Sequence, residues 1–390
     1  METIKKDVVV VGLGAIGSAT LWRLAARGVD VAGIEQQGIG HNLGSSHGLT
    51  RLFRVACFEH PGLPPIAKRS LALWQELGRQ TGLELVRQSG CLSSGPPQSS
   101  VVTGVHAAAK AAGLSVRDLD HDQLVAEFPN YGTIGGDDVG VFDPAAGLCF
   151  PERNVRAHTA AAVELGAEAY PYTRVLEITT VTDGVRISTP TVIFEAPQVI
   201  VTAGPWLGKL LPGLPVQPRR TPMYWFQPKD PQSTDFTLDR FPSFIRRLPD
   251  GTGLWGHGSS DEFGIKIGLD DNSTDSFAPT DPDQVDRYIH PERDIAELSH
   301  HVSVAFPGID PQPTKVITCM ITDSPDEQFL VGRPHGDSRL LIAGGCSGHG
   351  FKHSAGLGEL LAQQAVGEEP YTAIDFLDPN RFDLGAPILG

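Results

Sequence analysis

The sequence is poor in cysteine and in positive charge. Five cysteines occur among 390 residues, and no two of them form a CxxC pair; they are Cys57, Cys91, Cys149, Cys319 and Cys346. An odd number without such pairs favours neither a disulfide framework nor a cysteine zinc site. Lysine and arginine total 31 against 46 acidic residues, for a formal net charge of −15. This deficit argues against a general nucleic-acid surface, because phosphate binding needs clustered cations.

Long apolar runs are also missing. The N-terminus, METIKKDVVVVGLGAIG, has a short apolar run that leads directly into a glycine motif, so it does not predict a signal peptide. No stretch approaches the length of a membrane span, and we found no repeats and no biased linkers. We therefore expect a cytoplasmic protein. Its 40% apolar content, with 44 glycines and 31 prolines, is typical of a loop-rich globular enzyme of two domains or one large α/β unit with an insertion.

The first 35 residues predict a βαβ unit. A β-branched run over residues 7–11 predicts a buried strand, a helix follows that ends near Gly28, and a second strand ends at Glu35. The turn between strand and helix reads Gly12-x-Gly14-x-x-Gly17. These glycines permit a tight turn, close approach of backbone to a pyrophosphate and close helix–strand packing, while Glu35 can accept a hydrogen bond from a ribose hydroxyl. The motif predicts dinucleotide binding but does not separate NAD from FAD.

Nucleotide-fold elements recur in the middle and at the end of the chain. Apolar periodicity predicts helices over 64–80, 100–113, 121–127, 282–288, 292–304 and 355–366, and strands over 91–95, 198–202, 223–227, 243–248, 253–258, 263–269 and 339–345. Residues 173–204 read as consecutive strands with Asp183-Gly184 as a hairpin turn, and the proline-rich stretches 212–222 and 228–231 as a crossing between modules. A discontinuous cofactor domain with an inserted substrate domain accounts for this order.

Several reactive side chains have more than one interpretation. Cys319 could be buried filler, a redox thiol, a metal ligand or a covalent attachment point. Lys266 in FGIKIG could lie on a solvated strand face, but its neighbours on that face are Gly264 and Gly268, which would leave space for a flat ring. Arg51 and Arg54 are three residues apart, so on a helix or turn they share one face, which by default is a solvated basic face.

His349 and His353 have a spacing that metal sites use. We do not expect a metal, because glycine-rich sequence surrounds them and no acidic ligand accompanies them.

Taken together, GLGAIGSA, GSSHGLTRLFR, TAGPW, FGIKIG, TCMITDSPDEQF and GCSGHGFKHS resemble the monomeric sarcosine oxidase family, which includes N-methyltryptophan, pipecolate and fructosyl-amino-acid oxidases. The resemblance covers nearly the whole chain. It implies an α/β fold with a Rossmann-like FAD-binding domain built from residues 1–82, 145–215 and 316–390, and an inserted antiparallel-sheet substrate domain built from 83–144 and 216–315.

The resemblance also implies roles for individual residues. FAD would be joined covalently to Cys319. Arg51 would lie near the flavin ring, Arg54 and Lys352 would bind the substrate carboxylate, and Lys266 would activate oxygen. The residues expected to contact FAD are Gly12, Gly14, Ala15, Ile16, Gly17, Glu35, Gln36, Ser45, Ser46, His47, Thr50, Arg51, Val175, Ala203, Gly204, Trp206, Cys319, Gly345, Gly348, His349, Gly350 and Lys352.

The implied reaction is oxidation of the C–N bond of a secondary amino acid. A hydride equivalent passes to flavin N5, the resulting imine hydrolyses, and O2 becomes H2O2. The expected partners are an amino-acid substrate and O2, with no nucleic acid and no membrane, and the expected state is a monomer.

The substrate pocket departs from the sarcosine enzymes at four positions. Trp255 replaces a tyrosine, Asp270 a histidine, and Ile321 and Cys57 each a tyrosine. These changes favour a larger N-substituted amino acid over sarcosine. We read Cys346, where relatives often carry an aromatic residue, as a packing residue.

Three alternatives stay open. A fructosyl-amino-acid oxidase would need a polar pocket, which His257, Asp261 and Asp270 could supply. An NAD-dependent dehydrogenase would leave Cys319, Lys266 and GCSGHGFK unexplained. A flavin-binding protein without catalysis would not need Lys266, Arg54 and Lys352 together.

Overall fold

The first layer of the molecule is a mostly parallel sheet. The computed structural model describes residues 2–132, 134–260, 263–270, 277–386 and 388–389. The sheet contains, in spatial order, β10 (Glu168–Tyr170), β3 (Val31–Ile34), β2 (Val8–Val11), β14 (Gln198–Val201), β21 (Leu340–Gly344) and β20 (Leu330–Gly332), of which only β20 is antiparallel to its neighbour. Four valines form β2 and all are buried, as expected for a parallel strand covered on both faces.

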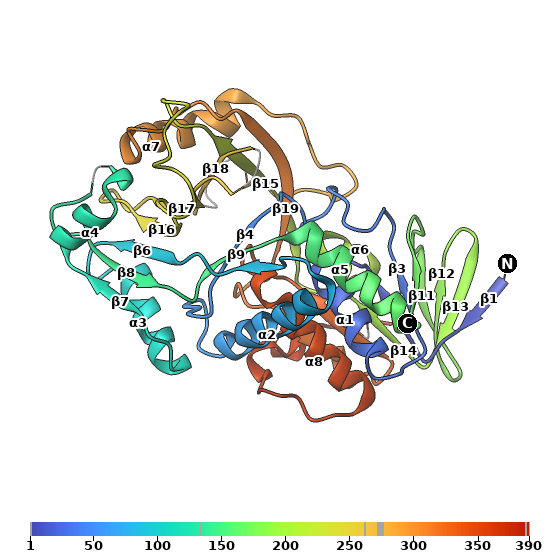
Figure 1. The fold of residues 1–390 in the computed structure, drawn as a ribbon. Helices are drawn as coiled ribbons and strands as arrows, with labels where there is room; N and C mark the ends of the chain where they lie inside the picture. The colour runs from blue at the N-terminus through green and yellow to red at the C-terminus, as the bar shows by residue number, and fades with distance from the viewer. Residues whose placement is uncertain (1, 133, 261–262, 271–276, 387, 390) are drawn as a thin grey trace.

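Helices cover one face of this sheet. They are α1 (Ala15–Ala25), α2 (Leu63–Thr81), α5 (Pro151–Glu164) and α8 (Ser354–Val366), and Figure 1 shows them gathered in one layer. Val8 and Val10 join their apolar core, whereas Val9 and Val11 point to the opposite face. There they pack against a second sheet made of β1 (Glu2–Lys5), β13 (Val192–Ala196), β12 (Gly184–Ser188) and β11 (Glu177–Val181).

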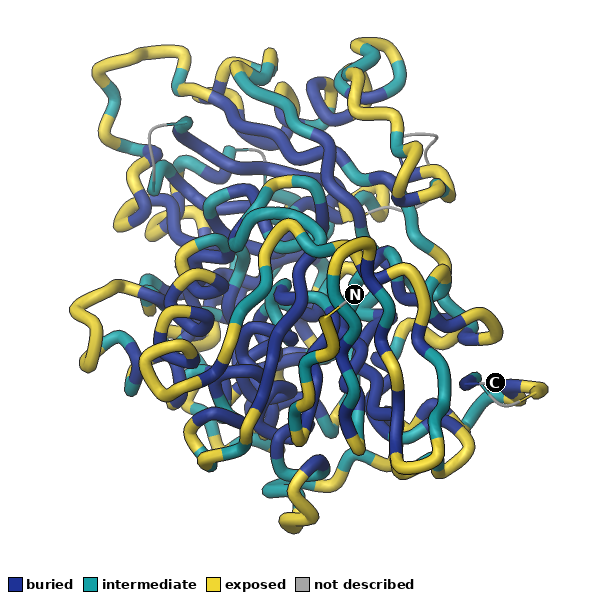
Figure 2. Tube along the Cα trace, turned by 90° about the vertical axis from the view of Figure 1, so that its right-hand side faces the viewer, coloured by how far each residue is buried: buried dark blue, intermediate teal, exposed yellow. Residues whose placement is uncertain are grey.

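The second large layer is an eight-stranded sheet. Its order is β19 (Lys315–Asp323), β15 (Gln217–Phe226), β18 (Ile265–Leu269), β17 (Gly253–His257), β16 (Ser243–Arg247), β6 (Cys91–Gly95), β8 (Val139–Asp143) and β7 (Arg117–Leu119). The helices α3 (Ser100–Ala112), α4 (His121–Glu127) and α7 (Ala296–Ala305) pack on it. An aromatic cluster that includes Tyr131, Phe241 and Phe306 fills its core. Figure 2 shows buried segments running through the interior of both layers, with exposed segments on the outer loops.

Short elements connect the layers. A three-stranded sheet is formed by β4 (Arg51–Phe53), β9 (Gly147–Cys149) and β5 (Val86–Arg87), and α6 (Leu207–Leu210) follows β14. Single helical turns occur at Pro129–Tyr131, Gly204–Trp206, Pro291–Ile295, Pro334–Gly336, Phe351–His353, Asp375–Leu377 and Pro379–Arg381.

Most of the predicted elements are confirmed, and the exceptions have physical reasons. No helix forms over 282–288; a turn at 282–283 is followed by irregular backbone, and the side chains bind distant segments. The proline-rich stretch 212–222 is not only a crossing, because Pro218 and Pro222 lie inside β15. Proline is tolerated at these positions because β18 pairs only with residues 224–226 of β15, so no ladder partner needs the N–H that proline lacks. The hairpin turn lies one residue earlier than predicted, because Val181 pairs with Gly184.

One further expectation needs correction, and one predicted boundary falls within a strand. Arg51 begins the strand β4 rather than a helix or turn, so Arg51 and Arg54 do not share a face by helical spacing. The domain boundary drawn at residue 316 falls within β19, which pairs with β15 in the eight-stranded sheet. None of the helices in the described chain is both long and apolar enough to cross a membrane.

Candidate active site

A cavity of about 760 Å³ lies between the two large sheets. One wall comes from the turns at the carboxyl ends of β2, β3, β14 and β21, which is where ligands bind to open parallel sheets. The other wall comes from β15, β17, β18 and β19. Most of the predicted residues line it: Gly12, Gly14, Ala15, Ile16, Glu35, Gln36, Ser45, Ser46, Arg51, Arg54, Val175, Ala203, Gly204, Trp206, Trp255, Asp270, Cys319, Ile321, Gly345, Gly348, His349, Gly350 and Lys352.

Four residues predicted to contact FAD or substrate lie outside the cavity wall: Gly17, His47, Thr50 and Lys266. Cys57, which the sequence analysis placed in the substrate pocket, is fully buried and does not line the cavity either. Gly17 has the predicted packing position, since a Cβ there would lie 1.8 Å from the Gly12 carbonyl oxygen. His47 and Thr50 are buried beneath the wall, and the Thr50 hydroxyl is 2.8 Å from Nε2 of His257.

The end of the cavity near β2 has the geometry of a dinucleotide site. Gly12 has φ +90°, and a Cβ there would lie 2.7 Å from the Thr202 carbonyl oxygen, so only glycine suits this turn. The N–H groups of Leu13 and Gln37 donate to the two carboxylate oxygens of Glu35 at 3.0 and 2.9 Å. Glu35 is thereby fixed at the end of β3, where it can accept a hydrogen bond from a ribose, while the N-terminus of α1 faces the cavity and favours a phosphate.

Cys319 lies near the middle of β19. Its sulfur lines the cavity, 3.8 Å from Nη2 of Arg51. Burial raises the pKa of the Cys319 thiol, although Arg51 acts in the opposite direction. The thiol therefore faces the dinucleotide space from the opposite sheet, beside a cation that favours its thiolate.

Lys266 is buried in the centre of β18 and is not on a solvated strand face. Its ammonium group donates to the carbonyl oxygens of Gly48 and Thr50 at 2.7 and 3.0 Å and lies 4.8 Å from the ring centroid of Trp225. The segment that it holds contributes Arg51 to the cavity wall.

The flat ring that lies against β18 belongs to Trp255. A Cβ on Gly268 would approach its indole to 2.4 Å, and the indole N–H donates to the Leu269 carbonyl oxygen at 3.0 Å. The space that the glycines leave at this position is therefore filled by the protein itself.

Arg54 and Lys352 converge on one acidic side chain that the sequence interpretation missed. Nη2 of Arg54 and Nζ of Lys352 lie 2.8 and 2.9 Å from the same oxygen of Glu59. Burial alone would raise the pKa of Glu59, but Lys352 and Arg54 outweigh it and hold the pKa well below its ordinary value. The only signal for Glu59 in the sequence was an acidic residue five positions after Arg54.

Beside this charged group the cavity wall is largely apolar. It includes Trp255 and Ile321 together with Ile245, Phe58 and Phe277. Asp270, directly after β18, also lines it, with an exposed carboxylate 3.5 Å from Arg247.

Of the described residues considered for a sugar pocket, Asp270 lines the cavity and His257 does not. His257 is buried outside the cavity wall, and Asp261 lies outside the described residues. Cys346 lines the cavity beside Gly350, so it is not only a packing residue.

No group of three or more metal-ligating side chains is gathered among the residues that the structure describes. His349 contacts the Glu327 carbonyl oxygen through Nε2 at 2.9 Å. Burial, followed by the charge of Lys352, lowers the pKa of His349 to about 4.

Comparison with known proteins places this geometry in a family. The family model for FAD dependent oxidoreductases, DAO, matches residues 7–364. The chain is 34% identical to monomeric sarcosine oxidase from Streptomyces avermitilis, covering 96% of this chain and 97% of that protein. It is 30% identical to N-methyl-L-tryptophan oxidase from Yersinia pestis, covering 91% and 94%. The open form of NikD, described as an unusual amino acid oxidase essential for nikkomycin biosynthesis, superposes with a TM-score of 0.81 at 22% identity, covering 96% and 98%.

Proposed function

Because the chain belongs to the DAO family of FAD dependent oxidoreductases, we propose that it oxidises the C–N bond of a secondary, N-substituted amino acid that is larger than sarcosine. The observation that carries this proposal is the contact of Arg54 and Lys352 with one carboxylate oxygen of Glu59. Two cations that hold an internal carboxylate in this way can hold the carboxylate of an amino acid at the same place.

FAD fits the residues of this cavity. Glu35 and the turn at Gly12 would hold its ADP half, and Cys319 lies on the opposite wall, where it would attach to the flavin. FAD supplies the acceptor for the hydride and the electrons that convert O2 to H2O2.

The protein side chains bind and orient the substrate. Arg54 and Lys352 fix the carboxylate, and the apolar wall at Trp255 and Ile321 excludes water along the N-substituent. The positive charges of Arg51 and Lys352 lower the pKa of a nearby ammonium, which favours the neutral amine that can release a hydride. The fixed charge of Lys266 stabilises negative charge that develops on O2.

The proposal extends to the state of the enzyme. We infer a cytoplasmic monomer whose nucleotide domain comprises residues 1–82, 145–215 and 316–390 and whose substrate domain comprises 83–144 and 216–315. β19 joins the two, since its sequence lies in the first domain and it pairs with β15 of the second.

Anaerobic mixing with sarcosine, N-methyltryptophan, pipecolate and a fructosyl amino acid tests the reaction. We expect the N-alkyl or cyclic amino acids to bleach the flavin absorption band, with N-methyltryptophan faster than sarcosine. Bleaching by the fructosyl compound alone would instead favour a deglycating oxidase. A colourless protein that binds NAD would contradict the proposal altogether.

Covalent attachment has its own test. After acid precipitation we expect flavin to stay with the protein pellet, and the Cys319→Ser variant to release it. Release of all flavin from the wild-type protein would refute attachment at Cys319 without refuting the oxidase reaction.

A further inference from the structure

A segment that the proposed chemistry does not use crosses the nucleotide end of the cavity. Residues 281–287, here called the strap, form a turn at 282–283 followed by irregular backbone, and they lead into the Pro291–Ile295 turn. Pro282, Asp283, Val285 and Arg287 of the strap cover a smaller cavity of about 240 Å³. Gln36, Arg174 and Trp206 line both this cavity and the large one, so the strap forms the outer wall next to the nucleotide site.

Asp283 binds three donor side chains on one side of the nucleotide end of the large cavity, here called the nucleotide groove. The indole N–H of Trp206 donates to one carboxylate oxygen at 2.8 Å, and the Lys209 ammonium lies 2.6 Å from the other. Nη2 of Arg174 lies 3.3 Å from that second oxygen. Trp206, Lys209 and Arg174 all line the large cavity. A single carboxylate of the strap therefore orients three side chains of the cavity wall.

Arg287 binds the other side of the groove. Its Nη2 donates to the Leu43 carbonyl oxygen at 2.7 Å. Leu43 immediately precedes the Gly44–Ser45–Ser46 turn of the cavity wall, in which the Ser46 hydroxyl accepts from the Ala15 N–H at the start of α1. The strap thus spans the groove from Trp206 to Leu43.

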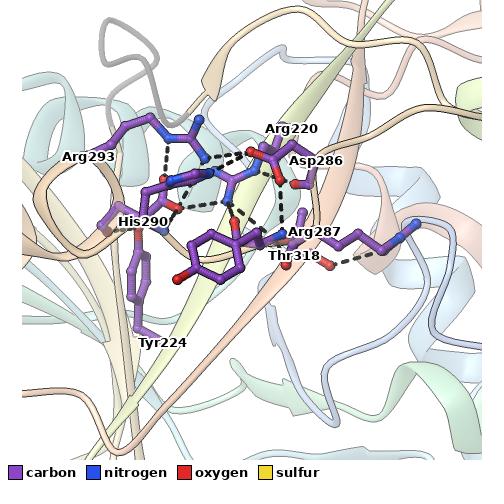
Figure 3. Close-up of polar contacts among 9 residues, drawn as sticks. Arg220, Tyr224, Asp286, Arg287, His290, Arg293 and Thr318 are labelled. Carbon is purple, nitrogen blue, oxygen red and sulfur yellow. Dashed lines mark hydrogen bonds and ion pairs between the residues drawn. The ribbon is translucent and has the colours of Figure 1, made fainter.

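A buried ion pair fixes the far end of the strap. Arg220 on β15 binds both carboxylate oxygens of Asp294 at 2.8 Å, and both side chains are almost fully buried. Arg220 also donates to the backbone carbonyl oxygens of Asp286 and Tyr288, as the network in Figure 3 shows. Arg287 follows Asp286 directly, so this anchor fixes the backbone position from which the Arg287 side chain extends.

We propose that the strap is a clasp for the ADP half of FAD, and that Asp283 is the residue that closes it. The inference rests on the proposed occupation of the large cavity by FAD. With the clasp closed, Arg174 and Trp206 are held in the wall of the nucleotide site. FAD can leave only after the contacts of Asp283 break, so loss of these contacts accelerates its release.

The rate of FAD release from the Cys319→Ser protein tests this proposal without any amine substrate. We expect Asp283→Ala to accelerate release about tenfold, because it removes three charge-assisted contacts, and Asp283→Asn to lie between Ala and the parent. Asp281→Asn is the matched control, because Asp281 pairs with only Lys209 of these three side chains, and asparagine keeps the oxygen that accepts the Asp283 N–H. Its release rate should stay within about twofold of the parent, since exposed single ion pairs contribute little.

Salt provides a readout that a purely structural role would not change. The contacts of Asp283 are partly exposed, so added salt should accelerate FAD release from the parent by screening them. The acceleration should be smaller in Asp283→Ala. Unchanged release in Asp283→Ala, or equal effects of Asp281→Asn and Asp283→Ala, would overturn the clasp. A protein that binds no FAD would overturn the proposed function as well, so the two failures are distinguishable.

Discussion

At the carboxylate end of the cavity, Glu59 lies where a substrate carboxylate would have to bind. Arg54 and Lys352 are its partners, so under the proposed function a substrate carboxylate would compete with Glu59 for the same two cations. Glu59 keeps both buried cations paired when no substrate is bound. This pairing matters because an unpaired buried charge is costly.

Glu59→Gln should strengthen carboxylate binding. Removing the internal charge while keeping an acceptor oxygen leaves both cations more available, worth about 1 kcal/mol or roughly fivefold in affinity. Titration with acetate, followed by the flavin spectrum, measures the dissociation constant. Glu327→Gln is the control, because Glu327 lines the same cavity but makes no ion pair with Arg54 or Lys352 in the described chain. Equal or weaker acetate binding in Glu59→Gln would contradict this competition.

Lys266→Met should separate the two halves of the reaction. The ammonium of Lys266 is held by two carbonyl oxygens beneath the cavity wall, so it is a fixed positive charge that methionine removes with little change of volume. We expect substrate to reduce the flavin at nearly the wild-type rate, and reoxidation by O2 to slow by about 100-fold or more. Stopped-flow mixing measures both steps. Lys315→Met, at the start of β19, is the control, and wild-type reoxidation of Lys266→Met would exclude this role.

At the scale of elements, the pairing of β17 with β18 shapes the substrate pocket. Trp255 lies opposite Gly268 in the ladder, and its indole covers that glycine. The indole can lie against β18 only while position 268 has no side chain.

Gly268→Ala should therefore displace the indole of Trp255. Its Cβ would lie 2.4 Å from the ring, and relieving such overpacking costs about 1–3 kcal/mol in the free energy of unfolding. Urea unfolding measures this loss, and KM values for N-methyltryptophan and sarcosine report the change of pocket shape. Gly136→Ala is the control, since a Cβ there meets nothing within 4 Å. If both variants unfold like wild type, the close packing of Trp255 on Gly268 is wrong.

Local patterns predicted many elements but not their partners. The βαβ unit was legible because Val8–Val11, α1 and β3 each have their own periodicity. The irregular strap was wrongly predicted as a helix, because its conformation depends on Lys209, Trp206 and Leu43 from remote parts of the chain. β15 was predicted too short for a similar reason, since β19 supports its proline-containing half.

At the scale of the whole molecule, buried neutral histidines set the response to acid. Burial lowers the pKa of His158 to about 3, with Arg23 adding to the effect, and burial likewise lowers the pKa of His257 to about 3. A histidine whose folded-state pKa lies below its unfolded value near 6.5 contributes its full stability above pH 6.5. This contribution is lost as the pH falls toward the folded-state value.

We expect the free energy of unfolding to fall below pH 6.5 by about 1.4 kcal/mol per pH unit for each such histidine. Between pH 6 and 4, His158→Phe should reduce that slope by the contribution of one histidine, about 1.4 kcal/mol per pH unit. Phenylalanine cannot take up a proton, and the ring at 158 can keep its stacking on Trp22. Urea unfolding at several pH values measures the slope. His300→Phe, at an exposed position on α7, is the control, and parallel curves for wild type and His158→Phe would contradict the prediction.

The sequence by itself determined the dinucleotide turn, the acidic residue after β3, the family resemblance and the candidate cations, because each depends on residues close together in the chain. Only the tertiary structure decided which of them meet. Residues 54, 59 and 352 converge on one carboxylate oxygen, Trp255 fills the space beside Gly268, and the strap bridges Trp206 and Leu43. These contacts join segments up to 293 residues apart, and local periodicity carries no information about such distant pairs because packing between whole layers creates them.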